Sequence, residues 1–231
     1  MTTSDYRSAA PGSSAADSSG VRPARRRLMG FTIAVLAGII LVFAGMRIQG
    51  DVPHIIDGSL PADDDFAERY IQNPVLAYLH IGFGVVYLLG APLQLAHRFR
   101  SRHYAVHRRL GKVLLGAGVV SGVFALAFGL PHAFGGLSEA IATAIFGSWF
   151  IACLVTAFVW IRRGDVVRHR RWMIRAFAVG LGVGTIRIWV GVFTIAGLEL
   201  PDSFAVAFWV GFLLHVAAGE LWLRTTPHPG G

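Results

Sequence analysis

Histidines gather in the apolar part of this 231-residue chain, and seven of the nine lie between positions 80 and 215. Neutral imidazoles on facing membrane helices can ligate haem b, and nearby arginines can pair with the haem propionates. The candidate ligands are His80, His107, His169 and His215. Their spacing is unfavourable, because about four turns after His80 the same helix carries Gln94 instead of a second histidine. A haem b electron carrier is therefore kept as an alternative interpretation.

A second kind of chemistry comes from ionisable residues at similar depth in apolar stretches. Such residues are costly in a bilayer and mark functional sites by default. At about 1.5 Å per residue, His80 and Arg187 both fall in the outer third of their helices. His132 and Glu139 lie at the same outer face. The sequence thus predicts a buried polar site of His80, Arg187, His132 and Glu139, although structural packing roles would place the same residues there.

The inner ends of the apolar stretches hold another polar group. Arg175 lies three residues into one stretch, and Glu220 lies three residues before the end of another. Their matched depth predicts an ion pair that joins two helices. His215 and Gln94 are expected near this level, as further candidates for a buried polar site.

Two basic loops repeat a short motif where a helix is expected to begin. One reads His107-Arg108-Arg109, and the other reads His169-Arg170-Arg171 followed by Trp172 and Met173. Anionic groups are favoured near helix amino ends, so His107, Arg108, His169 and Arg170 could meet a phosphate or carboxylate. Most of the arginines are explained by membrane topology and by anionic lipids at the cytoplasmic face. Nucleic acid is not expected as a partner, because these short loops offer no folded reading surface.

Catalytic patterns are absent from the sequence. There is no defensible Ser-His-Asp order and no His-Glu-x-x-His motif, and the carboxylates are widely separated. Cys153 is the only cysteine, which excludes an intrachain disulfide and a cysteine-only metal site. We therefore do not expect an enzyme.

The elements that position these residues follow from composition. The chain is 54% hydrophobic and only 15% charged, with a net charge of +8 and a mean hydropathy of +0.57, which excludes an ordinary soluble domain. A bilayer core needs about 20 mostly apolar residues in a helix. Six stretches qualify: 28–46, 75–96, 110–130, 140–161, 172–197 and 203–223. The predicted fold is an all-α bundle of six transmembrane helices, with a core of the second to fifth helices.

Charge predicts how this bundle is oriented. Eighteen of the 21 basic residues fall on one side, in the two basic loops and the two tails. The positive-inside rule makes that side cytoplasmic, so both termini of this multi-pass protein are expected in the cytoplasm. Only Arg47 and Arg69 lie in the opposite loops, and Arg187 lies within a span.

The expected organisation has five parts. Residues 1–27 form a disordered cytoplasmic tail, 28–46 a first transmembrane helix, and 47–74 an acidic extracytoplasmic loop with a short helix near residues 62–71. Residues 75–223 form a five-helix membrane domain, and 224–231 a cytoplasmic tail. The first helix is interpreted as a retained anchor, because its apolar run exceeds that of a signal peptide.

Residues 169–178, which read HRRWMIRAFA, resemble the signature of the bacterial predicted membrane proteins grouped as domain of unknown function 2306 (DUF2306). The resemblance extends over about residues 75–225 and includes His80, Gly90-Ala91-Pro92-Leu93-Gln94, the His107 motif and Thr185-Ile186-Arg187. It implies a multi-pass membrane protein and brings no agreed activity.

Three functions therefore stay open at this point. The first is a membrane protein of unknown activity whose buried His/Arg site binds a small molecule or lipid, for transport or sensing. The second is the haem b electron carrier, and the third is a structural or assembly factor whose arginines serve topology alone. The pattern specifies neither the ligand nor the oligomeric state.

Overall fold

The computed structural model describes residues 23–226, and within that range all regular secondary structure is α-helical, without a strand. The tail positions 1–22 and 227–231 lie outside the described residues, as does most of the tail expected over residues 1–27. The helices are α1 (Pro23–Asp57), α2 (Asp65–Gln72), α3 (Pro74–Leu95), α4 (His97–Arg102), α5 (Tyr104–Gly129), α6 (Gly136–Arg162), α7 (Val166–Ile195) and α8 (Leu200–Thr225).

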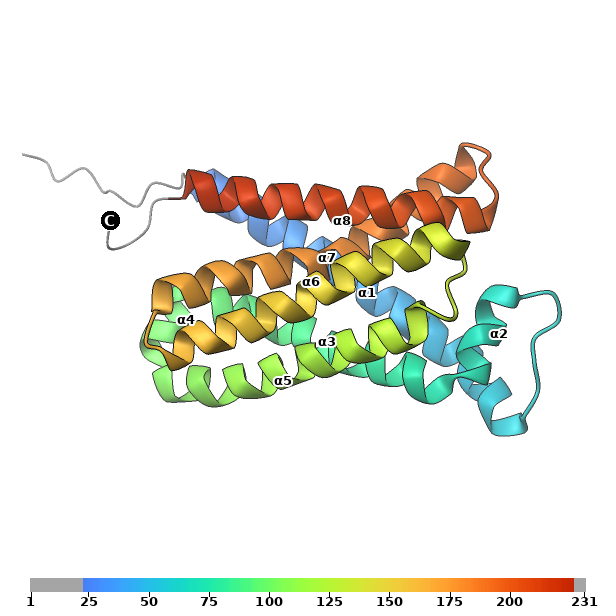
Figure 1. The fold of residues 1–231 in the computed structure, drawn as a ribbon, viewed down its shortest axis with the longest axis horizontal. Coiled ribbons are helices and arrows are strands. Elements are labelled where there is room, and N and C mark those ends of the chain that lie inside the picture. The colour runs from blue at the N-terminus through green and yellow to red at the C-terminus, as the bar shows by residue number, and fades with distance from the viewer. Residues whose placement is uncertain (1–22, 227–231) are drawn as a thin grey trace, which may run out of the picture.

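Six of these helices are long and apolar enough to cross a membrane: α1, α3, α5, α6, α7 and α8. The predicted all-α fold with six spans is confirmed. Each span is helical because lipid offers no partner for free backbone amides. The long helices lie roughly side by side, with α4 and the start of α7 at one end of the bundle and α2 at the other (Figure 1).

Local sequence fixes where several helices begin. The Asp64 side chain accepts a hydrogen bond from the amide of Ala67 and caps α2, while Asp165 accepts one from Arg168 and caps α7. Proline in the first turn opens α3 and α8, where its missing amide costs no hydrogen bond. Helix α1 does not end at position 46, where its most apolar run stops, but continues to Asp57.

The core lies along α7, which packs against α3, α6, α8 and α1. Small residues permit this close packing: a Cβ added to Gly211 of α8 would lie 2.6 Å from Cγ1 of Ile186 on α7. The sixth span is more central than expected, since Ala207 and Phe212 of α8 belong to the same buried cluster as Phe146 of α6. Helix α1 is the most exposed span, and Leu36 is its main buried apolar contact with that cluster.

Candidate functional site

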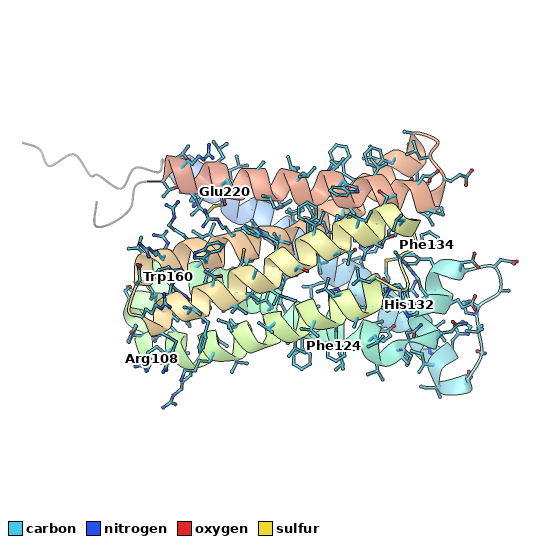
Figure 2. The ribbon with its side chains drawn as sticks, viewed as in Figure 1. Arg108, Phe124, His132, Phe134, Trp160 and Glu220 are labelled. Atoms are coloured by element: carbon cyan, nitrogen blue, oxygen red, sulfur yellow. The ribbon has the colours of Figure 1, made fainter. Side chains whose placement is uncertain are left out.

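A cavity of about 630 Å³ opens within the α2 half of the bundle. Helices α1, α2, α3, α5, α6, α7 and α8 all contribute to its wall, which is mostly aliphatic and aromatic. The four residues expected at the outer face, His80, His132, Glu139 and Arg187, all line this one cavity. The further polar side chains in its wall include Arg47, Arg69, Ser121, Thr143 and Thr194. His132 and Phe134 mark this end of the bundle in Figure 2, opposite Arg108 and Trp160.

Arg187 carries a charge within the membrane-spanning part of α7. Its guanidinium lies over two rings, 5.7 Å from the centroid of Phe43 on α1 and 5.8 Å from that of Phe204 on α8. No carboxylate of residues 23–226 forms an ion pair with it. Cation–π contact stabilises such a charge only partly. Arg187 therefore offers an unmatched positive charge to the cavity.

Arg69 approaches the same cavity from α2. Its Nη1 donates a 2.6 Å hydrogen bond to the carbonyl oxygen of His132, and its guanidinium lies 4.4 Å from the ring centroid of Phe66 and 4.9 Å from that of Phe134. Its Nε is buried without a hydrogen-bond partner in the described part of the chain. Burial lowers the pKa of Arg69 from its ordinary value; Tyr70 and Glu139 oppose this effect, and the neighbouring cation Arg187 adds to it. An anion beside Arg69 would relieve both costs.

Arg47 differs from the other two arginines because it is already neutralised. Its guanidinium pairs with Asp51 one turn later on α1 and lies 4.7 Å from the ring centroid of Tyr70. Asp51 is only 1% exposed, and its Oδ2 also accepts a 2.7 Å hydrogen bond from the Tyr78 hydroxyl. This carboxylate is therefore committed to the joint between α1 and α3.

The carboxylate of Glu139 is likewise occupied by the protein. Glu139 is 4% exposed, and its Oε2 accepts a 2.6 Å hydrogen bond from the backbone amide of Gly135. It ties down the turn before α6 and makes no ion pair with either Arg69 or Arg187 among the residues described. Arg69 and Arg187 thus have no ion-pair partner in the described residues, and Glu139 interacts with them only electrostatically.

His80 joins two walls of the cavity. Its Nδ1 donates a 3.0 Å hydrogen bond to the Ser121 carbonyl oxygen on α5, and the Ser121 hydroxyl donates a 2.9 Å bond to the His80 carbonyl oxygen. This reciprocal pair fixes the imidazole between α3 and α5, where the ring lines the cavity. Such a ring can orient a polar group of a ligand without itself being charged.

Sequence reasoning missed Arg47, Arg69, Phe66 and Tyr70, which belong to the stretch interpreted as an acidic loop. A usable signal was present. Arg47 and Arg69 are the two basic residues that break the charge bias, and both line the cavity together with Arg187. Every basic residue outside the arginine-rich side of the chain therefore meets in one place.

The other predicted polar residues lie away from the cavity. Arg175 donates to Glu220 from Nε at 2.5 Å and from Nη2 at 3.0 Å, which joins α7 to α8. His215 Nε2 lies 2.6 Å from the Thr185 hydroxyl on the same pair of helices. Gln94 is buried between α3 and α5.

The two His-Arg motifs lie at the end of the bundle opposite α2. His169 Nδ1 donates a 2.9 Å hydrogen bond to the Ala157 carbonyl oxygen, and Arg108 lies 6.0 Å from the Tyr104 ring centroid. Trp172 packs near Trp149 and carries the Arg175 guanidinium over its ring, while Met173 packs on the core. His107 and Arg170 are half-buried near the starts of α5 and α7.

The haem interpretation is not supported. The ring of His215 is bonded to Thr185, the ring of His169 to Ala157, and the ring of His80 to Ser121. Within positions 23–226, no group of three or more His, Cys, Asp or Glu side chains is arranged to hold a metal ion.

The Arg175–Glu220 pair gives a direct stability prediction. We expect Arg175→Gln to lower the free energy of unfolding by about 2 kcal/mol, because Glu220 then keeps a partly buried charge without its partner. Arg168→Gln on the same helix is the matched control, since its ion pair with Asp165 is largely exposed. Thermal unfolding in detergent measures both variants. Equal melting temperatures for the two would show that Arg175 and Glu220 contribute no more than a surface pair.

These features define a class: a multi-pass α-helical membrane protein with an arginine-bearing cavity in one half of its bundle. The family description "Predicted membrane protein (DUF2306)" matches residues 77–223. The chain therefore belongs to the DUF2306 family of predicted membrane proteins, whose molecular function is unknown. No curated protein and no solved structure matches it. Helices α1 and α2, which supply Arg47 and Arg69 to the cavity, precede the matched residues.

Proposed function

We propose that the cavity binds an amphiphile with an anionic head group and an apolar body, for transport across the membrane or for sensing. One observation carries this proposal. Of the 21 basic residues, the three that are not on the arginine-rich side are Arg47, Arg69 and Arg187, and all three line the cavity. Topology does not require arginines there, since positive charge belongs on the opposite side.

We infer an anionic head group because two arginines of the cavity wall have no ion-pair partner among the described residues. Arg187 has no ion-pair partner in the described range, and Arg69 has a buried Nε without a hydrogen bond. Of the two nearby carboxylates, Asp51 is paired with Arg47 and bonded to Tyr78. Glu139 accepts from the Gly135 amide and interacts with Arg69 and Arg187 only electrostatically, without an ion pair in the described residues. Guanidinium groups bind carboxylate and phosphate through short, charge-assisted hydrogen bonds.

The body of the ligand is apolar because the rest of the wall is apolar. Aromatic side chains crowd the wall near Arg69, and aliphatic residues of α3 and α7 continue it toward the middle of the bundle. A volume of about 630 Å³ is in the range of small-molecule sites. Helix α1, the least buried span, forms one side of this wall and faces the bilayer on its other side. A ligand dissolved in the bilayer can therefore reach the cavity beside α1.

The head-group proposal is tested with three probes that have the same length of alkyl chain and different head groups: palmitic acid, hexadecyl phosphate and hexadecanol. Native mass spectrometry of the detergent-purified protein measures the occupancy of each. We expect the two anions to bind at least about tenfold more tightly than the alcohol. Equal binding of all three probes would contradict the proposal that the head group is anionic. If none of the three probes bound, the binding proposal would be wrong, and the arginines would be structural elements of an assembly factor.

We further propose that the α4 end faces the cytoplasm of a bacterial cell, in its cytoplasmic membrane, with both tails on that side and anionic lipids around it. The charge bias supports this orientation, as do the positions of the α1 start and the α8 end, which lie at the same end of the bundle as α4 (Figure 1). On this view the 47–74 segment is extracytoplasmic and the cavity lies in the outer half of the bilayer.

Cysteine labelling tests the orientation, because the chain has one cysteine and it is buried. In a Cys153→Ala background, Asp63→Cys and Ser101→Cys place single thiols at the exposed α2 and α4 ends. We expect a membrane-impermeant maleimide to label position 63 in intact cells, and position 101 only after permeabilisation. The reverse labelling pattern would show that the protein has the opposite orientation in the membrane, with the cavity in the inner leaflet.

A further inference from the structure

The opposite end of the bundle holds a second cluster of basic side chains, formed by Arg100 on α4, His107 on α5, and His169 and Arg170 on α7. We propose that this basic cluster binds a phosphate-type oxyanion, either a lipid phosphomonoester head group or free phosphate. This basic cluster lies at the opposite end of the spans from the cavity. The proposal therefore goes beyond the function proposed for the cavity. Figure 2 shows this end of the molecule around Arg108 and Trp160.

The four side chains come from three helices, and α4 and α5 are in contact with each other. All four are half-buried. Arg100 interacts electrostatically with each of the other three, and His107 also with His169. The repeated His-Arg motifs of the sequence thus converge on one arginine, which belongs to neither motif.

Unpaired polar atoms lie beneath this cluster. Gln94 is 9% exposed, and its Nε2 has no hydrogen-bond partner in the described chain; nor has the buried Nδ1 of His107. The Gln94 side chain lies against α5 one turn beyond His107, because a Cβ added to Gly111 would be 3.3 Å from Gln94 Oε1. Buried polar groups without partners are uncommon in folded proteins and call for a bound group.

Protein carboxylates do not balance the charge. Asp165 pairs with Arg168 and caps the start of α7, and Glu220 pairs with Arg175. The start of α5 adds positive potential, since His103 at its N-cap makes no side-chain cap hydrogen bond. Holding the Arg100 and Arg170 guanidinium groups near each other in a half-buried place is unfavourable unless an anion joins them. Two guanidinium groups, two imidazoles and a helix start suit the several oxygens of a phosphate.

Membrane topology alone does not account for this arrangement. The positive-inside bias needs basic residues near the span ends, and exposed arginines satisfy it. Arg98 and Arg102 on α4 are exposed in this way, while Arg100 between them is turned into the bundle and half-buried. Arg98 and Arg102 therefore supply a control with the same charge on the same helix.

The test compares two double variants of the full-length protein: Arg100→Gln/Arg170→Gln, which alters the basic cluster, and Arg98→Gln/Arg102→Gln, which removes the same charge from the surface. Retention of phosphatidic acid is measured by native mass spectrometry after transfer from nanodiscs of phosphatidylcholine with a minor fraction of phosphatidic acid. Inorganic phosphate is then added as a competitor. Size-exclusion chromatography checks that each variant is folded.

We expect the cluster variant to retain phosphatidic acid at least about tenfold less tightly, and the surface variant to change affinity by less than about threefold. Competition by inorganic phosphate would identify free phosphate as a ligand, and retention that phosphate does not displace would identify the lipid head group. Equal losses in the two variants would overturn the proposal in favour of a diffuse charge effect. Unchanged retention in both would overturn it as well. As a second readout, phosphate or phosphatidic acid should raise the melting temperature of the wild type and not of the folded cluster variant.

Discussion

Replacing Arg187 with glutamine is expected to weaken binding of hexadecyl phosphate by about tenfold to a hundredfold, while binding of hexadecanol stays unchanged. Arg187, like Arg69, lines the cavity without a carboxylate ion-pair partner in the described residues, so its charge is available to the ligand. A hydrogen bond to a charged group contributes about 1.5–3 kcal/mol, and each 1.4 kcal/mol is about tenfold in affinity. Native mass spectrometry of the purified variant measures both affinities.

The control for this variant is Arg162→Gln, which removes the same charge from an exposed position at the far end of α6. It should leave the affinity for hexadecyl phosphate within about twofold of the wild type, since exposed charges are screened by water and salt. If Arg162→Gln weakened binding as much as Arg187→Gln, the net charge of the protein would account for the effect. An unchanged affinity in Arg187→Gln would exclude this side chain as the head-group ligand.

Replacing Gly135 with alanine is expected to lower the melting temperature by about 10 °C. An added Cβ would lie 2.6 Å from the backbone nitrogen of Ala205 and 2.8 Å from the carbonyl oxygen of Pro201, both on α8. Backbone atoms cannot rotate away, so the starts of α6 and α8 must separate. Overpacking costs about 1–3 kcal/mol, and each kcal/mol shifts the melting temperature by about 2–4 °C in a chain of this size.

The effect of Gly135→Ala should also extend to the cavity. The backbone amide of residue 135 donates to Glu139, which lines the cavity. Separation of α6 from α8 would also pull Phe134 away from Phe204 of the cavity wall; the two ring centroids are 5.5 Å apart. Gly116→Ala on α5 is the matched control, because no atom lies within 4 Å of its added Cβ. Thermal scanning of both variants in one detergent decides the matter. A stable Gly135→Ala protein would show that α6 and α8 are not held at this distance.

Hydropathy and charge were sufficient to predict the six spans, because membrane helices obey strong length and polarity constraints. Depth counting along those spans also placed His80, Arg187, His132 and Glu139 at one level, and they line one cavity. It placed Arg175 beside Glu220 for the same reason. Helices in a bilayer run nearly antiparallel, so position along one helix translates directly into height in the bundle.

Other parts of the site could not be predicted in this way. Arg47 and Arg69 belong to a segment without a long apolar run, and their positions depend on the continuation of α1 to Asp57 and on the packing of Phe66 against Phe134 and Phe204. These are contacts between distant segments, which periodicity does not report. The convergence of the two His-Arg motifs on Arg100 depends in the same way on how α4 folds back beside α5.

The central claim is that an anionic amphiphile occupies the cavity with its head group beside Arg187. Photo-crosslinking in nanodiscs tests it most directly, with a palmitic acid analogue that carries a diazirine midway along its chain. We predict that labelled peptides contain residues of the inner wall such as Ile81, Val85 and Val183, and that hexadecyl phosphate suppresses the labelling while hexadecanol does not. Labelling confined to bilayer-facing residues such as Leu213 and Leu214, with no effect of hexadecyl phosphate, would contradict the claim.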